Sequence, residues 1–200
     1  MKVVLADYGA GNLRSLSSAL VRAGADPVVT VEPKAVAEAP LAMIAGVGHV
    51  GSAAEGLARH GLDDALRERV AAGRPVAGVC VGMQLLFGES EEGGRGLAFL
   101  DGAVPRLRAR RVPHMGWNTL RATRPSATVA GLDGADVYFA HSFSVEPKDD
   151  AVTAATVHHD GPVVAAVELG VLAGVQFHPE RSGAAGARVL ENLLRWSRSA

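Results

Sequence analysis

Apolar residues in the first half of the chain follow two different periods. Short and almost continuous apolar runs, typical of buried parallel strands, occupy residues 2–6, 27–31, 41–44 and 75–79. Between them, apolar residues recur every three or four positions, as on the buried face of a helix, over 13–23, 53–60 and 62–72. Asn12 is a suitable N-cap for the first helix, and Gly24 a suitable end. Strands that alternate with helices predict a parallel sheet with helices on both faces.

The pattern changes near residue 100 to a series of short strands. We expect these strands at 103–107, 117–121, 136–140, 152–157, 163–167 and 171–177. Asp160-Gly161 is typical of a hairpin turn, and a final helix is expected over 184–196. The predicted fold is therefore α/β in one domain over residues 1–200. It has a mostly parallel central sheet flanked by helices, with additional antiparallel strands in the C-terminal half.

Composition excludes several classes of protein. A chain of 200 residues that is 48% hydrophobic can bury a substantial core. The net charge of -1, without long blocks of one sign, argues against nucleic acid or a membrane surface as a partner. No apolar run approaches the roughly 20 residues of a membrane span. The single cysteine, and an N-terminus too quickly polar for a signal peptide, favour the reducing cytoplasm.

The single cysteine lies where a buried strand meets a helical pattern over 81–87. Cys80 is flanked by Gly78 and Gly82, which gives G-x-C-x-G, the thiol counterpart of the G-x-S-x-G nucleophile elbow. Such a turn strains its central residue and leaves little room for side chains two positions away. The helix N-terminus would favour the thiolate, and the Val81 N–H would donate to a developing oxyanion. Taken alone, the pattern fits a buried, inert cysteine equally well.

A second candidate group follows the apolar strand at 171–177. Pro179 ends that strand, so His178 is expected at its carboxyl end, on the same sheet edge as Cys80, with Glu180 two residues further. A thiol nucleophile needs a base, and the base needs a group that fixes its tautomer. These three residues supply the three roles in order, which favours a Cys–His–Glu triad over a structural histidine.

Two glycine-rich stretches follow other predicted strands. Gly9-Ala10-Gly11 lacks the third glycine of the dinucleotide-binding fingerprint, and a tight turn explains it better. Gly46-Val47-Gly48 follows the third strand, at the edge where open α/β sheets bind ligands. This loop could donate a second N–H to an oxyanion, or it could be a plain connection.

The remaining titratable residues are less informative. His60, His158 and His159 are expected to face solvent, whereas His114 and His141 stand in denser sequence contexts. Four arginines near residue 108 are interpreted as the solvated face of a strand rather than a phosphate-binding patch: Arg106, Arg108, Arg110 and Arg111. The chain has no zinc-type ligand spacing, so we expect no metal site, and we expect no cofactor.

Together, the motifs resemble the class I (triad) glutamine amidotransferases, and within them the glutaminase subunit of imidazole glycerol phosphate synthase. GVCVGMQLL around Cys80 and QFHPE at His178 and Glu180 are shared by the wider class. The more specific blocks are DYGAGNLRS at 7–15, GVG at 46–48, VPHMGWN at 112–118 and FAHSF at 139–143. The blocks run in the family's order along essentially the whole chain, and the resemblance implies a flavodoxin-like fold.

The resemblance also implies a role for each site residue. Cys80 would attack the side-chain amide of L-glutamine, His178 would carry the proton to leaving ammonia, and Glu180 would orient His178. The oxyanion would be held by backbone N–H groups of Val81 and of the glycine loop, at Val47 or Gly48. The residues expected to bind glutamine are Gln84, Ser142 and Phe143. Those expected on or near a docking face are Asn12, Trp117, Tyr138 and Arg181.

A glutaminase of this size leaves no room for a domain that would use the ammonia, so we expect a partner. The resemblance implies a heterodimer with a (β/α)8-barrel cyclase, which makes imidazole glycerol phosphate and an aminoimidazole carboxamide ribotide in histidine biosynthesis. Alternatives are a glutaminase serving anthranilate, pyridoxal phosphate or GMP synthesis, and a non-catalytic partner-binding module. The chain departs from the family at Ala45, where proline is usual, at His49-Val50, and at Arg181, where lysine is usual.

Overall fold

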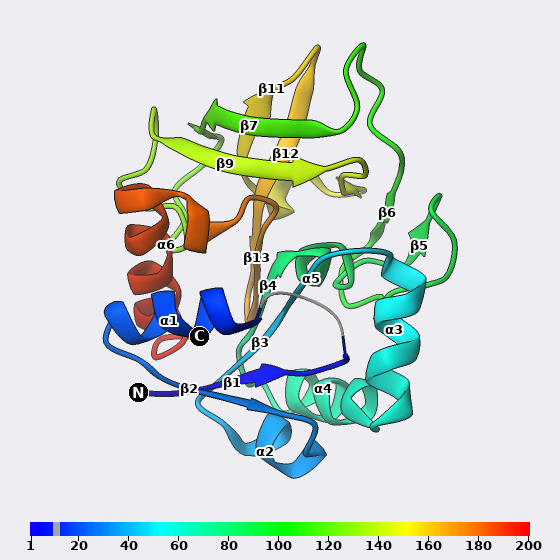
Figure 1. Cartoon of the computed structure of the whole chain (residues 1–200), viewed down its shortest axis with the longest axis vertical. Helices are drawn as coiled ribbons and strands as arrows, with labels where there is room; N and C mark the ends of the chain where they lie inside the picture. The colour runs from blue at the N-terminus through cyan, green and yellow to red at the C-terminus, as the bar shows by residue number, and fades with distance from the viewer. Residues whose placement is uncertain (10–12) are drawn as a thin grey trace.

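The computed structural model describes residues 1–9 and 13–200 and is built on an eight-stranded mixed sheet (Figure 1). Its parallel part contains, in spatial order, β2 (Asp26–Thr30), β1 (Lys2–Ala6), β3 (Leu41–Gly46), β4 (Val76–Cys80) and β13 (Leu172–Val175). The sheet continues antiparallel with β12 (Pro162–Leu169), β11 (Thr153–His158) and β8 (Arg121–Ala122). This arrangement confirms the predicted α/β fold, with a parallel N-terminal part and antiparallel strands added by the C-terminal half.

Helices cover both faces of the parallel part, as Figure 1 shows. α1 (Leu13–Arg22) and α6 (Gly183–Trp196) pack together on one face, and α3 (Val50–Arg59) and α4 (Leu62–Ala71) on the other, with α2 (Pro33–Glu38) against α4. The predicted N-cap of α1, Asn12, lies outside the described residues. In the part of the chain that the structure describes, none of the helices has the length and apolar character needed to traverse a bilayer.

Two smaller sheets complete the fold. β7 (His114–Thr119) and β9 (Asp136–His141) form an antiparallel ribbon, which packs against β11 and α6. β10 (Glu146–Pro147), β6 (Gly102–Val104) and β5 (Glu89–Ser90) form a three-stranded sheet. Two short 3-10 turns, η1 (Asp150–Val152) and η2 (Pro179–Arg181), precede β11 and α6. The ribbon is therefore a separate sheet that packs against the main sheet rather than extending it.

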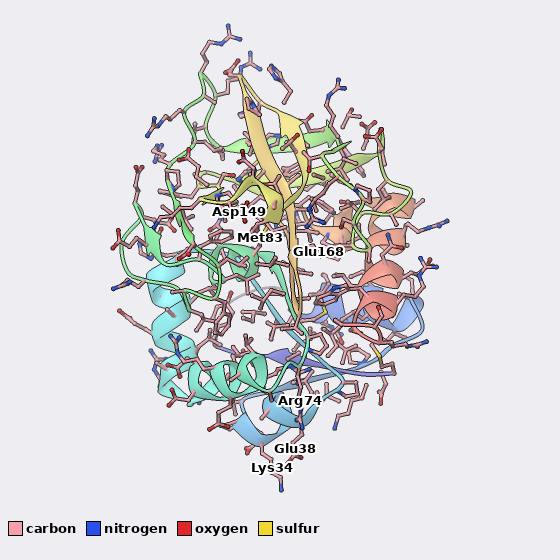
Figure 2. The ribbon with its side chains drawn as sticks, turned by 180° about the vertical axis from the view of Figure 1, so that it is seen from behind. Lys34, Glu38, Arg74, Met83, Asp149 and Glu168 are labelled. Carbon is pink, nitrogen blue, oxygen red and sulfur yellow. The ribbon has the colours of Figure 1, made fainter. Side chains whose placement is uncertain are left out.

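The central strands end at one edge of the sheet. β3 pairs Gly46 with Cys80, and β13 pairs Val175 with Val79, so the carboxyl ends of β3, β4 and β13 lie at the same level. Figure 2 shows the course of β4 through the molecule. Arg74, two residues before β4, lies in the lower part of the view, and Met83, in the turn of helix that follows β4, lies at mid-height. The expected glycine loop, elbow and His178 segment therefore leave the sheet together.

The helix expected over 81–87 is much shorter. α5 spans only Val81–Gln84, one turn. The carbonyl groups of Leu85, Leu86 and Phe87 accept hydrogen bonds from backbone N–H groups of residues 97–100 instead of continuing a helix. Because a helix needs these carbonyls for its own i to i+4 bonds, the returning segment ends α5.

Other element boundaries also differ from expectation. The strand expected over 103–107 ends at Val104, because Pro105 follows and cannot donate to a ladder. The four arginines after it therefore do not lie on one strand, although Arg106, Arg108, Arg110 and Arg111 are exposed as expected. The strand expected over 117–121 is two strands, β7 and β8, which belong to different sheets. The Asp160-Gly161 hairpin turn is confirmed, since it joins the antiparallel pair β11 and β12.

Candidate active site

The turn from β4 into α5 contains no loop residue, and Cys80 is its strained centre. Cys80 has φ 55° and ψ -113°, and a positive φ outside glycine costs of order 1–3 kcal/mol. A Cβ on Gly78 would lie 2.4 Å from the carbonyl oxygen of Gly82, and a Cβ on Gly82 would lie 1.8 Å from that of Ile44. Both glycines are therefore required by close backbone contact, as the G-x-C-x-G pattern predicted.

The short α5 changes the expected electrostatics of the thiol. One turn sums few peptide dipoles, so α5 gives Cys80 little of the helix-dipole effect that a helix over 81–87 would supply. The positive charge near Cys80 comes instead from His178, which forms a side-chain hydrogen bond with it. The cationic group beside the sulfur thus comes from the segment that follows the neighbouring strand β13.

His178 follows β13, the parallel neighbour of β4. Its backbone N–H donates to the carbonyl oxygen of Tyr138 at 2.8 Å, and its Nδ1 lies 2.9 Å from Oε1 of Glu180. Burial alone would lower the pKa of His178, but hydrogen bonds to Cys80 and Glu180 outweigh it and raise the pKa to about 10. The imidazole is therefore held as an imidazolium between a sulfur and a carboxylate.

Glu180 lies in η2, and its side chain is 9% exposed. Its Oε1 faces His178, while its Oε2 is buried and makes no hydrogen bond within the described part of the chain. A buried carboxylate with one free oxygen is costly unless a cation stands beside it. The nearby imidazolium provides that cation, and Glu180 in turn holds the His178 proton on Nδ1.

A pair of buried amides lies beside Cys80. Gln84 donates from Nε2 to the carbonyl oxygen of Phe143 at 2.8 Å and to Oε1 of Gln176 at 3.0 Å. Gln176 donates from its own Nε2 to the Sγ of Cys80 at 3.6 Å. Gln176 was not among the predicted site residues, although it stands two positions before His178. The signal available in the sequence was a polar amide at the end of an apolar strand, two positions before a candidate base.

A pocket of about 200 Å³ opens over Cys80. Its lining includes all of the residues predicted for the oxyanion and for glutamine: Val47, Gly48, Val81, Gln84, Ser142 and Phe143. Val81 begins α5, where backbone N–H groups have no intrahelical partner, and Gly48 has φ 105°, a conformation suited to glycine. The structure therefore brings together the elbow, the glycine loop and the Ser142-Phe143 segment around one cavity.

The pocket also contains a carboxylate that the sequence reasoning missed. Glu92 lines the cavity, and its Oε2 accepts a hydrogen bond from the Val50 N–H at 3.3 Å. His49 caps α3 by accepting from the Gly51 N–H, and its Nε2 lies 2.5 Å from the Glu92 carbonyl oxygen. His49-Val50, where the chain departs from the family pattern, thus ties the glycine loop to Glu92. Within its own segment Glu92 is one of several acidic residues, so no local pattern singled it out.

The residues expected on a docking face lie beyond the pocket, with one exception. Asn12 is outside the described residues. Trp117 is 59% exposed and meets Tyr138 edge to face at 6.0 Å, and the Arg181 guanidinium lies 5.8 Å from the centre of the Tyr138 ring. Three large apolar side chains are exposed in this region, Val47, Met115 and Trp117, and the first two line the pocket.

The histidines fall into two groups. His60 and His158 are exposed, as expected, but His159 is half-buried and stacks on His114 with ring centroids 4.2 Å apart, so the expectation that it faces solvent is wrong. The segment after β6 brings Arg111 close to His159, whose Nε2 lies 2.7 Å from the Arg111 carbonyl oxygen.

Over the described ranges 1–9 and 13–200, no cluster of His, Cys, Asp and Glu could hold a metal ion.

Comparisons with known proteins agree with this geometry. Residues 4–196 match the family model for "Glutamine amidotransferase class-I". The chain is 46% identical over 199 residues to the imidazole glycerol phosphate synthase subunit HisH of Mycolicibacterium paratuberculosis, covering 96% of each. It is 43% identical over 195 residues to the same subunit of Moorella thermoacetica, covering 96% of this chain and 93% of that one.

Solved structures show the same fold at lower identity. A crystal structure of a glutamine amidotransferase aligns with a TM-score of 0.80 at 20% identity, over 98% of each chain. A structure of PurLQS from Thermotoga maritima aligns with a TM-score of 0.75 at 19% identity, also over 98% of each chain. At these identities the likeness shows a shared fold alone.

Proposed function

Because this chain belongs to the class-I glutamine amidotransferases, and within them to the HisH subunits of imidazole glycerol phosphate synthase, we propose that it is a glutaminase acting in histidine biosynthesis. The observation that carries the proposal is the line of groups at one sheet edge. A strained Cys80 forms a hydrogen bond with His178, whose Nδ1 lies 2.9 Å from Glu180. Nucleophile, acid–base group and orienting group are thereby in the order that thiol acyl transfer requires.

The first half of the reaction forms a thioester. The Sγ of Cys80 attacks the side-chain carbonyl carbon of L-glutamine, and the carbonyl oxygen becomes an oxyanion. The Val81 N–H and an N–H of the glycine loop, at Val47 or Gly48, stabilise that oxyanion. His178 then gives its proton to the nitrogen as the C–N bond breaks, and ammonia leaves.

The second half releases glutamate. His178, now neutral, takes a proton from water as the water oxygen attacks the thioester carbonyl carbon. The C–S bond breaks, Cys80 is regenerated as thiolate, and the proton stays on His178. The sum is glutamine plus water giving glutamate plus ammonia. Glu180 keeps the Nδ1 proton in place, so that Nε2 carries out both transfers.

The pocket supplies groups for the rest of the substrate. Gln84 and the Ser142-Phe143 segment present amide, hydroxyl and carbonyl groups beside Cys80, and Glu92 presents a negative charge. Glutamine carries an α-ammonium group, which pairs best with a carboxylate in a partly dry site. We therefore assign Glu92 to the α-ammonium, and the Ser142-Phe143 segment to the substrate chain.

Ammonia requires a consumer, and we propose a (β/α)8-barrel cyclase subunit that forms a heterodimer with this chain in the cytoplasm. The relatives in Mycolicibacterium and Moorella are named as subunits of a synthase, over nearly their whole length. The exposed side chains Met115 and Trp117 lie beside the pocket, and Arg181 covers the Tyr138 ring next to them. Exposed apolar groups of this size favour a protein contact over free solvent.

The test compares two sources of nitrogen in the complex reconstituted with the cyclase. Cys80→Ala should abolish glutamine-dependent turnover and leave turnover with ammonium salts unchanged. Glutamine-dependent activity in that variant would contradict the proposal. Labelling separates an enzyme from a non-catalytic binding module: a glutamine analogue bearing an alkylating group should label wild-type Cys80, and an inert cysteine would stay unlabelled.

The partner assignment has its own readout. Glutaminase activity of the isolated chain should be weak and should rise strongly when the cyclase and its nucleotide ligand are added. Full activity of the isolated chain would refute this regulation. A chain that instead served anthranilate, pyridoxal phosphate or GMP synthesis would show no response to the histidine-pathway cyclase.

A further inference from the structure

Two buried histidines that the proposed reaction does not use form a hydrogen-bonded pair, and one of them, His141, lines the pocket. His114 of β7 lies directly across the ribbon from His141 of β9, and Nδ1 of His114 is 3.0 Å from Nε2 of His141. On one side, the Asn118 amide nitrogen is 3.1 Å from Nε2 of His114. On the other, Nδ1 of His141 is 2.8 Å from the carbonyl oxygen of Phe143. All four ring nitrogens of the pair therefore have a partner.

The partners at the two ends determine the direction of these hydrogen bonds. The Phe143 carbonyl can only accept, so Nδ1 of His141 carries a hydrogen and its Nε2, in a neutral ring, is an acceptor. Nδ1 of His114 must then donate to His141, which leaves Nε2 of His114 to accept from the Asn118 amide. The second hydrogen of that amide donates to the His158 carbonyl oxygen at 2.9 Å. Every donor meets an acceptor without conflict.

The surroundings keep both rings neutral. His114 is 4% exposed and is stacked between Phe139 and His159, at centroid distances of 4.5 Å and 4.2 Å. Burial, followed by the nearby His141, lowers the pKa of His114 to about 3. For His141, burial is also the largest cause, and the pKa falls to about 4. Neither imidazole is therefore charged at neutral pH, as a one-directional chain requires.

The chain ends at the substrate pocket. The Phe143 carbonyl that accepts from His141 also accepts from Gln84 at 2.8 Å, and Gln84 donates to Gln176, which donates to Cys80. The carbonyl is thus held from two sides, by the histidine pair and by the amide pair. A carbonyl with two fixed donors cannot rotate without leaving a buried polar group unpaired.

We propose that His114 and His141 are positioning residues, which through a one-directional hydrogen-bond chain fix the Ser142-Phe143 segment against the bound glutamine. The proposal rests on the glutaminase function proposed above, because the segment is assigned to glutamine binding there. Both histidines act on a substrate-binding segment rather than on the reacting atoms. Their loss should therefore raise KM for glutamine more than it lowers kcat.

Two substitutions at His114 separate positioning from packing. In His114→Asn, the amide nitrogen replaces the Nδ1 donor; in His114→Leu, apolar volume is kept and the donor is lost. A lost donor to a buried acceptor predicts a KM for glutamine raised roughly tenfold to a hundredfold in the Leu variant. The Asn variant should recover most of that loss. His60→Asn, at an exposed position, serves as the control and should leave KM unchanged.

The assay uses the complex with the cyclase subunit, with ammonium-dependent turnover measured in parallel. If His114→Leu has a lower KM for glutamine than His114→Asn, the volume of the side chain matters more than its hydrogen-bond donor, and the proposal is overturned. Equal KM values for wild type and both variants would also overturn it. If wild type itself fails to hydrolyse glutamine, the proposed function fails instead, and the following measurement still tests the chain.

Nitrogen-15 NMR of the imidazole rings reports the tautomers directly. Both His114 and His141 should show a hydrogen on Nδ1 and none on Nε2 across neutral pH. In His114→Leu the Nε2 signal of His141 should lose the shift of a hydrogen-bonded acceptor, while Nδ1 keeps its hydrogen bond to the Phe143 carbonyl. His60 gives the reference signal for an exposed ring. An Nε2-protonated tautomer at either residue, or a charged ring, would break the direction of the chain and reject the proposal.

Discussion

The side-chain amide of Gln176 donates a hydrogen bond to the Sγ of Cys80 across 3.6 Å. Gln176 is fully buried, and its own oxygen accepts from Gln84 at 3.0 Å, so its orientation is determined. A donor aimed at the sulfur stabilises negative charge there before substrate arrives. The sulfur of Cys80 thus has a buried amide donor in addition to His178.

Replacing the amide donor of Gln176 by an acceptor should lower the rate at which the Cys80 thiol reacts. In Gln176→Glu, the oxygen that accepts from Gln84 can be kept, while a carboxylate replaces the amide beside Cys80. Because two negative groups would then face each other, we expect iodoacetamide labelling of Cys80 to slow by roughly tenfold or more. The control is the labelling rate of the urea-unfolded variant, which should equal that of unfolded wild type. A folded variant labelled at the wild-type rate would contradict this view.

Removing the sulfur should lower the pKa of His178. Burial opposes the imidazolium, and the hydrogen bond to Cys80 is the largest of the effects that raise the pKa to about 10. In Cys80→Ala the effects of burial and Glu180 remain, so the NMR titration of His178 should move to lower pH. The raised pKa also stabilises the fold fully below about pH 6.5, and this stabilisation is lost as pH rises toward about 10. An unchanged titration would mean that Glu180 alone holds the charge.

Adding one methyl group at Gly82 should strongly destabilise the fold. A Cβ on Gly82 would lie 1.8 Å from the Ile44 carbonyl oxygen, which is backbone and cannot rotate away. We expect Gly82→Ala to lower the free energy of unfolding by about 1–3 kcal/mol or more, measured by urea denaturation. Gly161→Ala is the matched control, because a Cβ there meets nothing within 4 Å, and its stability should be nearly that of wild type.

The Glu168 carboxylate should account for part of the loss of folding stability at acidic pH. Glu168, labelled in Figure 2, accepts hydrogen bonds from Ser126 and from the Ala127 and Thr128 N–H groups. Burial alone would raise its pKa, but these bonds, those of Thr128 foremost, outweigh burial and hold the pKa below its usual range. The resulting stability is present above the ordinary glutamate pKa of about 4.3 and is lost as pH falls through the folded-state value.

Urea denaturation at several acidic pH values tests this assignment. Glu168→Gln should be less stable than wild type at pH 7, by about 1.5–3 kcal/mol for a charge-assisted network. The difference should shrink as pH falls through the lowered folded-state pKa of Glu168, where the wild-type carboxylate takes up a proton. Glu55→Gln, at an exposed position of α3, should change neither stability nor its slope with pH. A pH-independent deficit in Glu168→Gln would show that the charge is not the source.

Local patterns predicted the elements whose stability is local. The strands β1, β3 and β4 are continuous apolar runs, and α1, α4 and α6 have one buried face, so spacing alone located them within a few residues. The end of α5 depends on residues 97–100 returning to its carbonyl groups, which no period within 81–87 records. Likewise, β7 begins at His114 because β9 pairs with it, not because its own sequence alternates.

The same distinction applies to the site. Cys80, Gly78 and Gly82 form a motif in five consecutive residues, and His178 and Glu180 another in three, so both were visible in the sequence. Gln176 and Glu92 matter because residues from distant segments contact them: Gln84 donates to Gln176, and the backbone of Val50, at the start of α3, donates to Glu92. A contact between segments 40 or more residues apart leaves no period in the chain.

The pairing of β4 with β13 has a consequence for how this chain can tolerate change in length. Val79 lies opposite Val175, and Cys80 and His178 follow one and three residues later. A strand advances by about 3.3 Å per residue, and a shift of one residue also turns each side chain to the other face. A single insertion or deletion in β4 or in residues 172–178 would therefore separate Cys80 from His178 or point one of them away. The hairpin at Asp160-Gly161 can gain residues without moving either group, so natural length variation should collect there and be absent from the two strands.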